Sequence, residues 1–175
     1  MMKTTFFSRL AKLALCFAAL TLLAGCSFFF GGDPSRYALF VQALPPVNDS
    51  APLKLRVLVL KSDADFMSAD FYSLQNNAAA VLGSNLLNSE QFFLMPGQLK
   101  KTLSGQLMPE ARYIGVMAEY QALNGKKWRL SLALPSPGDA SPVEGWQKKS
   151  DTLQARIVAD QYGVRVAGKQ ELLPE

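Results

Sequence analysis

Hydrophobic and polar positions divide the chain into an apolar beginning and a body of short alternating segments. Residues 13–23 form one uncharged run, whereas apolar and polar residues alternate in several segments after residue 36. Such alternation is the pattern of a half-buried strand. The clearest example, residues 53–60, has Leu55 and Val57 on one face and is apolar on both faces by its end. The body is therefore expected to be mainly β, with a second strand that ends fully buried.

The same alternation predicts further strands, separated by turn residues. They are expected at residues 36–44, 91–95, 99–107, 112–121, 127–134, 152–158 and 162–167. Pro96-Gly97 favours a turn, because proline presets φ and glycine tolerates a positive φ. Asn124-Gly125 between two apolar runs predicts a hairpin, and the proline-rich residues 135–150 predict a long polar loop. About seven or eight strands in one small domain predict a two-sheet β-sandwich.

One segment after the second strand changes to the period of a helix. Met67, Phe71 and Leu74 recur at helical spacing and predict an amphipathic helix over residues 64–75. A further helical turn or two is expected at residues 78–82 and 84–87. The sandwich should therefore carry a small helical insertion.

Three aspartates, Asp63, Asp65 and Asp70, lie in this predicted insertion. Carboxylates can bind metal ions, but acids in the first turn of a helix are also stabilised by the helix dipole. The second explanation suffices here, so no metal site is predicted.

The apolar beginning has the features of a secretory signal peptide. Three cations precede the uncharged run, and the small residues Ala24 and Gly25 lie directly before Cys26. The alternative is an uncleaved membrane helix, since about 18 uncharged residues can just cross a bilayer. Gly25, Gly31 and Gly32 weaken that alternative, because glycine disfavours helix.

The segment Leu23-Ala24-Gly25-Cys26 resembles the bacterial lipobox. That resemblance implies cleavage before Cys26, a lipid on its thiol and an acylated amine. Ser27, where retained lipoproteins have aspartate, implies sorting to the outer membrane, and several acyl chains suffice for stable anchoring. The expected organisation is a signal peptide at 1–25, a lipidated tether at 26–35 and a β-sandwich domain at 36–175.

Composition excludes several classes of function. The 175 residues contain 18 Lys and Arg against 14 Asp and Glu. Removing the three leader cations leaves 15 against 14, a net charge of +1 and no general footprint for nucleic acid. Histidine is absent, which excludes His-based catalytic triads and His-ligated metals. Cys16 leaves with the leader and Cys26 would be lipidated, so no disulfide is expected.

The connection between the first two predicted strands is long for a hairpin. Its residues are Pro45, Pro46, Val47, Asn48, Asp49, Ser50, Ala51 and Pro52. The prolines stiffen the loop and reduce the entropy lost on docking. Val47 is expected to offer a partner an apolar contact, and Asn48, Asp49 and Ser50 to offer hydrogen bonds. The alternative is that this loop is only a connector.

Several motifs then occur in a specific order from about residue 37 to residue 134. They are Val59-Leu60-Lys61, Ala64-Asp65-Phe66, Ala69-Asp70-Phe71, Ala80-Val81-Leu82-Gly83, Phe93-Leu94-Met95-Pro96-Gly97, Glu110-Ala111-Arg112-Tyr113-Ile114-Gly115-Val116 and Trp128-Arg129. Together with the lipobox, this set resembles the TssJ family, the outer-membrane lipoproteins of the bacterial type VI secretion system. The segment after residue 134 departs most from the family.

This resemblance implies a transthyretin-like β-sandwich, anchored in the outer membrane and facing the periplasm. It implies a structural role rather than catalysis, and no cofactor. The implied partner is the periplasmic C-terminal domain of TssM, which itself contacts TssL. The chief contact in that family maps onto residues 45–52.

The residues allow two other functions to be considered. Tyr120, Trp128 and Trp146 could form a platform on which a glycan or peptidoglycan fragment stacks, although aromatics at strand spacing usually belong to a core. A Ser-Lys hydrolase needs no histidine, but no motif places a serine near a lysine. We therefore predict neither an enzyme nor a small-molecule substrate.

Overall fold

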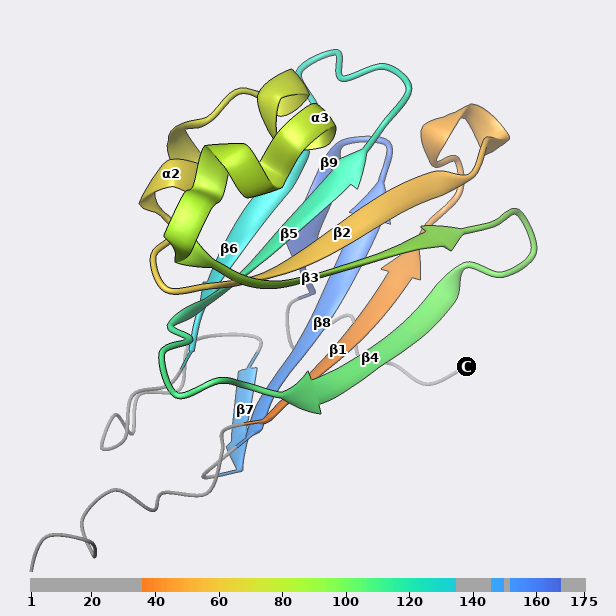
Figure 1. Ribbon diagram of the computed structural model, residues 1–175. Helices are drawn as coiled ribbons and strands as arrows, with labels where there is room; N and C mark the ends of the chain where they lie inside the picture. Colours follow the sequence, from red (N-terminus) through yellow and green to blue (C-terminus); the bar gives the residue numbers. More distant parts are fainter. Residues whose placement is uncertain (1–35, 135–145, 150–151, 168–175) are drawn as a thin grey trace, which may run out of the picture. The chain divides into compact units, whose positions relative to one another are not determined.

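The computed structural model describes residues 36–134, 146–149 and 152–167, which fold into two facing β-sheets (Figure 1). One sheet has the order β3 (Leu86–Leu94), β2 (Leu53–Leu60), β5 (Tyr113–Glu119) and β6 (Arg129–Ala133). The other has the order β4 (Lys100–Gln106), β1 (Arg36–Ala43), β8 (Thr152–Asp160) and β7 (Trp146–Lys149), and β9 (Gly163–Val166) also pairs with β8. β1 and β8 are parallel, and the other pairs are antiparallel. The predicted two-sheet β-sandwich is confirmed.

The main core lies between the two sheets. Leu39 of β1, Leu55 of β2, Ile114 of β5 and Ile157 of β8 are fully buried there. Burying one such side chain contributes about 1.5–3 kcal/mol. β2 is an inner strand of its sheet, and its other face is buried as well, as its sequence predicted.

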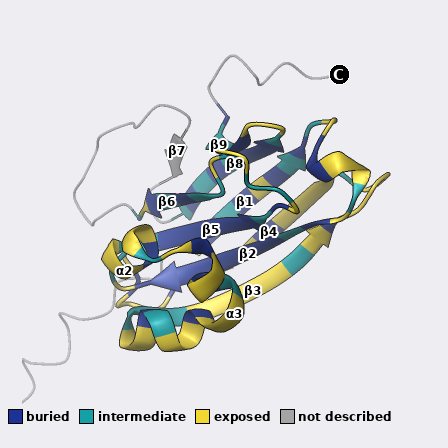
Figure 2. Cartoon of the chain, turned by 90° about the horizontal axis from the view of Figure 1, so that it is seen from above, coloured by how far each residue is buried: buried dark blue, intermediate teal, exposed yellow. Residues whose placement is uncertain are grey.

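Two helices cover the outer face of the β3-β2-β5-β6 sheet, and Figure 2 shows their buried sides turned toward it. They are α2 (Ala64–Ser68) and α3 (Phe71–Leu82). Phe66, Leu74 and Leu82 form a second core with Leu58 and Leu60 of β2. The predicted helical insertion after the second strand is therefore confirmed.

The prediction of one continuous helix over residues 64–75 is wrong. Ala69 is extended, with ψ 151°, and separates the two helices. Asp70 then begins α3, and its carboxylate accepts a hydrogen bond of 3.0 Å from the Ser73 backbone N–H. Hydrogen bonds from Ser73 lower the pKa of this carboxyl. The break turns Met67 outward, at 42% exposure, and Phe66 is the residue buried in its place.

Two other segments also differ from the predictions. β3 begins at Leu86, so the helical turn expected at 84–87 is wrong apart from a short 3₁₀ turn, Gly83–Asn85. Residues 88–91 of β3 are polar and exposed at a sheet edge, and this hid the strand pattern. Residues 146–149 form β7 rather than a loop, since their backbone pairs with β8. The rest of the 135–150 prediction lies outside the described residues.

No helix among the described residues has the length and apolarity needed to span a membrane. The predictions for the signal peptide, Cys26 and the tether fall on residues 1–35, which lie outside the described part of the chain.

Four connections meet at one end of the sandwich, which we call the loop end: residues 44–52, 95–99, 120–128 and 161–162. Backbone hydrogen bonds hold these connections to the sheets and to one another. Leu44 N–H donates to the Ala159 carbonyl at 2.8 Å, and Lys127 N–H donates to the Tyr162 carbonyl at 3.0 Å. The predicted Asn124-Gly125 hairpin is confirmed, with both residues at positive φ.

Candidate functional site

The candidate partner-binding loop, residues 45–52, connects β1 to β2 at the loop end. Its centre is a short 3₁₀ turn, Asn48–Ser50. Five of its residues are exposed, namely Pro45, Pro46, Asp49, Ser50 and Pro52. Ala51 is half-buried, and Val47 and Asn48 are buried. The loop therefore presents only part of its predicted contact set to a partner.

Asn48 holds this loop to the sandwich. Its side-chain Nδ2 donates to the Pro52 carbonyl at 2.8 Å, and its Oδ1 accepts from the Gln121 backbone N–H at 2.7 Å. Val47 belongs to the main core. The expectation that Val47 and Asn48 face a partner is wrong, because both side chains support the loop from inside.

Three consecutive residues of the loop have left-handed backbone: Asn48 at φ 51°, Asp49 at φ 51° and Ser50 at φ 65°. None is glycine, and each residue held there costs on the order of 1 kcal/mol. Such a conformation persists where surrounding contacts fix it, and Asn48 provides those contacts. The result is a fixed tip with Asp49 and Ser50 directed into solvent.

Asn48→Ala is expected to destabilise the fold by about 1–3 kcal/mol, because the Gln121 N–H and the Pro52 carbonyl both lose their hydrogen bond to this buried side chain. Urea denaturation followed by circular dichroism measures this. The matched control is Asn124→Ala, since Asn124 also has positive φ but is exposed. Equal losses of stability for the two variants would show that the backbone conformation at position 48 contributes to stability and that the two hydrogen bonds do not.

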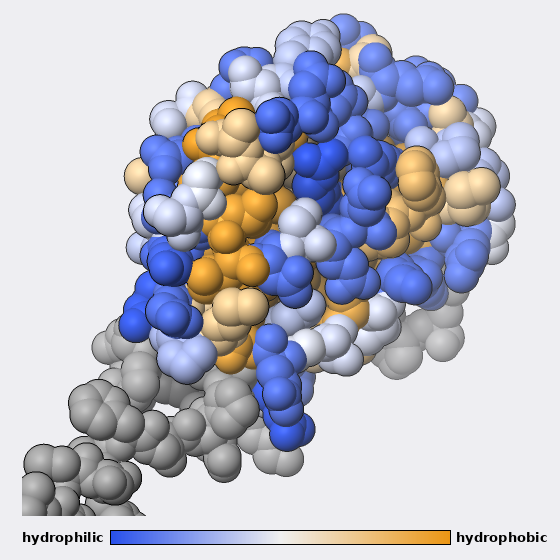
Figure 3. All heavy atoms as spheres, viewed as in Figure 1, coloured by the Kyte–Doolittle hydropathy of each residue, from blue (hydrophilic) through white to orange (hydrophobic). Residues whose placement is uncertain are grey.

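Exposed apolar side chains gather around the same loop end, and they were not among the predicted site residues. Phe93 is 54% exposed, Met95 44% and Tyr162 75%. Figure 3 shows apolar surface in orange where the end of β3 approaches loop 45–52. Phe93 lies opposite Lys54 in the strand register, next to the start of β2. The adjacent Phe92-Phe93 pair in an edge strand was the available signal, since only one of two neighbours can face a core.

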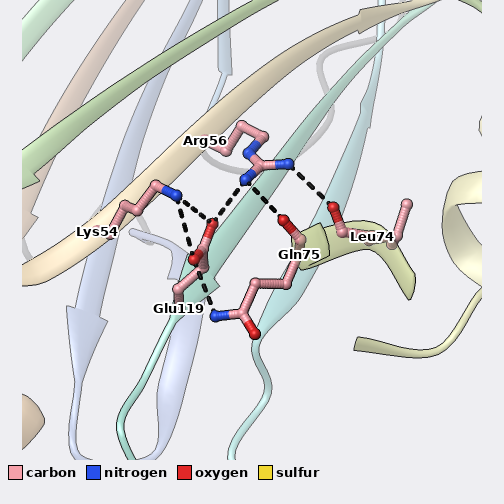
Figure 4. A network of polar contacts seen from close by, with 5 residues as sticks. All are labelled: Lys54, Arg56, Leu74, Gln75 and Glu119. Carbon is pink, nitrogen blue, oxygen red and sulfur yellow. Dashed lines mark hydrogen bonds and ion pairs between the residues drawn. The ribbon is translucent and has the colours of Figure 1, made fainter. Parts of the chain in front are cut away.

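A polar network joins the helical insertion to the sheet beneath it (Figure 4). Arg56 of β2 donates to the carbonyls of Leu74 at 2.9 Å and Gln75 at 3.2 Å, and to the Glu119 carboxylate at 3.0 Å. Lys54 also pairs with Glu119 at 3.2 Å, and the Gln75 side chain donates to it at 3.0 Å. The network fixes α3 on β2 and β5.

A groove of about 580 Å³ lies beside this network, between α3 and the segment after β5. Its lining residues are Lys54, Phe71, Tyr72, Gln75, Glu119, Tyr120, Gln121, Ala122, Leu123 and Asn124. Gln121, whose backbone is bonded to Asn48, belongs to its rim.

The three aromatics considered for glycan binding do not share an exposed platform in the described part of the chain. Tyr120 is 4% exposed, and burial raises the pKa of its hydroxyl, with a further contribution from Asp160. Trp128 packs edge-on against Phe71, with ring centroids 5.2 Å apart. The side chain of Trp146 lies outside the described residues.

The three aspartates of the insertion have separate structural partners. Asp63 accepts from the Ser131 hydroxyl at 2.7 Å, Asp65 from the Asn85 amide at 2.7 Å, and Asp70 caps α3. Across the described ranges, no three acidic, histidine or cysteine side chains lie close enough to hold a metal ion.

These features define a class of protein: a β-sandwich domain with helices on one sheet and its candidate site in the loops at one end. The chain belongs to the type VI secretion lipoprotein family, because the family model described as "Type VI secretion lipoprotein, VasD, EvfM, TssJ" matches residues 35–162. Members are structural lipoprotein components of that secretion system, and the family is not known for an enzymatic activity.

Solved structures agree with this assignment. The chain is 54% identical to Serratia marcescens Lip, described as a membrane-bound component of the type VI secretion system, with a TM-score of 0.68 over 78% of this chain and 98% of that one. It is 27% identical to the lipoprotein TssJ1 from Pseudomonas aeruginosa, with a TM-score of 0.65 over 78% and 97%.

A more distant match shows the fold alone. It is a chain in a structure described as the TssM C-terminal domain from EAEC, 18% identical, with a TM-score of 0.55 over 76% of this chain and 98% of that one. No curated protein matches the chain significantly.

Proposed function

We propose that this protein is an outer-membrane-anchored structural component of the type VI secretion membrane complex, which binds the periplasmic C-terminal domain of TssM through loop 45–52. Cys26 carries the lipid anchor, and the β-sandwich faces the periplasm. TssM in turn links the protein to TssL. Family membership supports the role in the complex.

One observation supports loop 45–52 as the binding site more than any other. Loop 45–52 has a tip whose exposed residues are held by a buried asparagine, and it lies beside exposed apolar side chains. A preformed loop loses little conformational entropy on docking, so more of the contact energy remains as affinity. Its prolines and the hydrogen bonds of Asn48 both restrict the loop before a partner binds.

Asp49→Arg is expected to weaken binding of the full-length protein to the TssM domain from the same genome by about tenfold or more, because it places a bulky reversed charge at the loop tip. Isothermal titration calorimetry in detergent measures the affinity. Glu110→Arg is the matched control, since it makes the same charge change at an exposed position after β4, away from the loop end. Equal affinity of wild type and Asp49→Arg would contradict the assignment of the loop, and no binding by wild type would contradict the partner.

A further inference from the structure

Tyr72 on α3 is an exposed aromatic side chain that packs against a buried neighbour. It is 65% exposed, and its ring meets that of Phe71 edge-on with centroids 5.3 Å apart. Phe71 is itself buried and packs against Trp128. Tyrosine, together with tryptophan and arginine, is enriched among the few residues that carry most of the binding energy of a protein interface. Phe71 already fills the core position at this turn of α3, so the Tyr72 ring is not needed for packing of the core.

The groove beside Tyr72 is continuous with the candidate loop. Gln121 at its rim donates its backbone N–H to Asn48, at 2.7 Å. Lys54, which also lines it, follows loop 45–52 by two residues. A partner that covers the loop tip therefore meets the groove and Tyr72 next.

The charges of the groove are already paired within the protein. Lys54 and Arg56 both contact Glu119, whose side chain is only 7% exposed. The remaining lining side chains are neutral amides, such as Gln75 and Gln121, or apolar and aromatic residues. This surface suits an uncharged polypeptide segment, with an apolar side chain against the aromatics and backbone groups toward the amides.

We propose that the groove between α3 and residues 120–124 is a second contact surface for the protein that binds loop 45–52, and that Tyr72 is its anchoring side chain. The proposal rests on the proposed function and assigns a role to the helical insertion. The insertion extends the interface from a single loop to the outer face of the β3-β2-β5-β6 sheet.

The test is the affinity of the full-length protein for the TssM periplasmic domain. Tyr72→Ala is expected to weaken binding by about tenfold or more, and Tyr72→Phe to retain most of the affinity, because the ring provides the contact. Phe40→Ala is the control, since Phe40 is an aromatic of 43% exposure on β1, in the other sheet. It is expected to bind as wild type does.

A second readout guards against a change in folding. A photoreactive phenylalanine analogue at position 72 is expected to cross-link to the TssM domain, and the same analogue at position 40 is not. If Tyr72→Ala binds within twofold of wild type, or position 72 gives no cross-link, while Asp49→Arg loses affinity, the groove is not a contact and the loop assignment stands. If wild type does not bind at all, both proposals fail.

Discussion

Replacing Arg56 by alanine is expected to lower the free energy of unfolding by about 3–5 kcal/mol, the range for removing one partner from a buried ion pair. Arg56 is buried, and its guanidinium contacts two helix carbonyls and the Glu119 carboxylate. Without it, the nearly buried Glu119 keeps Lys54 and the Gln75 side chain but loses its shortest ion pair.

The backbone of α3 explains why this arginine matters. Asn77, at φ −151° and ψ 65°, interrupts the helix, and its side chain accepts from the Ala80 N–H at 3.2 Å to start the next turn. A break leaves the carbonyls of the preceding turn without their regular donors. Arg56 supplies donors to two of them, Leu74 and Gln75. The arginine therefore acts as a cap that comes from the sheet rather than from the helix.

Urea denaturation monitored by circular dichroism measures the loss, and Lys54→Ala is the matched control. Lys54 contacts the same carboxylate but its side chain is 25% exposed, so its removal should cost at most about 1 kcal/mol. An Arg56→Ala variant as stable as Lys54→Ala would show that solvent replaces the guanidinium and that the cap is dispensable.

The features predicted correctly from the sequence are those that neighbouring residues determine. Alternation placed β2, since successive side chains of a strand face opposite sides. The Asn124-Gly125 pair placed a hairpin because both positions need positive φ, and both have it. These elements need no knowledge of distant parts of the chain.

The features predicted wrongly depend on distant partners. Asn48 was expected to face a partner protein, but its side chain is buried, where it accepts a hydrogen bond from the Gln121 N–H, far along the chain. Met67 was placed in the core because the helix was expected to continue through Ala69. Arg56 gave no signal of a capping role, because the carbonyls that it binds become free only through the break at Asn77. In each case the deciding contact joins residues that lie apart in the sequence.

Gly163→Ala is expected to destabilise the fold by about 3–5 kcal/mol, because two penalties add. Gly163 has φ 124°, a conformation that residues with a Cβ rarely adopt. A Cβ there would also overlap the backbone carbonyl and nitrogen of Lys127, which cannot move aside as a side chain can.

The contact at Gly163 joins the two sheets at the loop end. Lys127, in the connection before β6, forms a parallel bridge with Gly163 at the start of β9. Lys127 N–H donates to the Tyr162 carbonyl at 3.0 Å, and Val164 N–H donates to the Lys127 carbonyl at 2.6 Å. Pushing these backbones apart would break both hydrogen bonds.

Gly97→Ala separates the two penalties, and chemical denaturation of both variants measures them. Gly97 also has positive φ, at 89°, but an added Cβ there meets no atom within 4 Å. It should therefore cost only about 1 kcal/mol, the conformational part alone. The difference in stability between the two variants measures the steric part. Equal losses of stability would mean that the Lys127 backbone can shift to accommodate the added Cβ without a change in free energy. Since that bridge holds the 120–128 connection against β9, a large difference would establish that close backbone packing, and not only side-chain burial, maintains the geometry of the loop end.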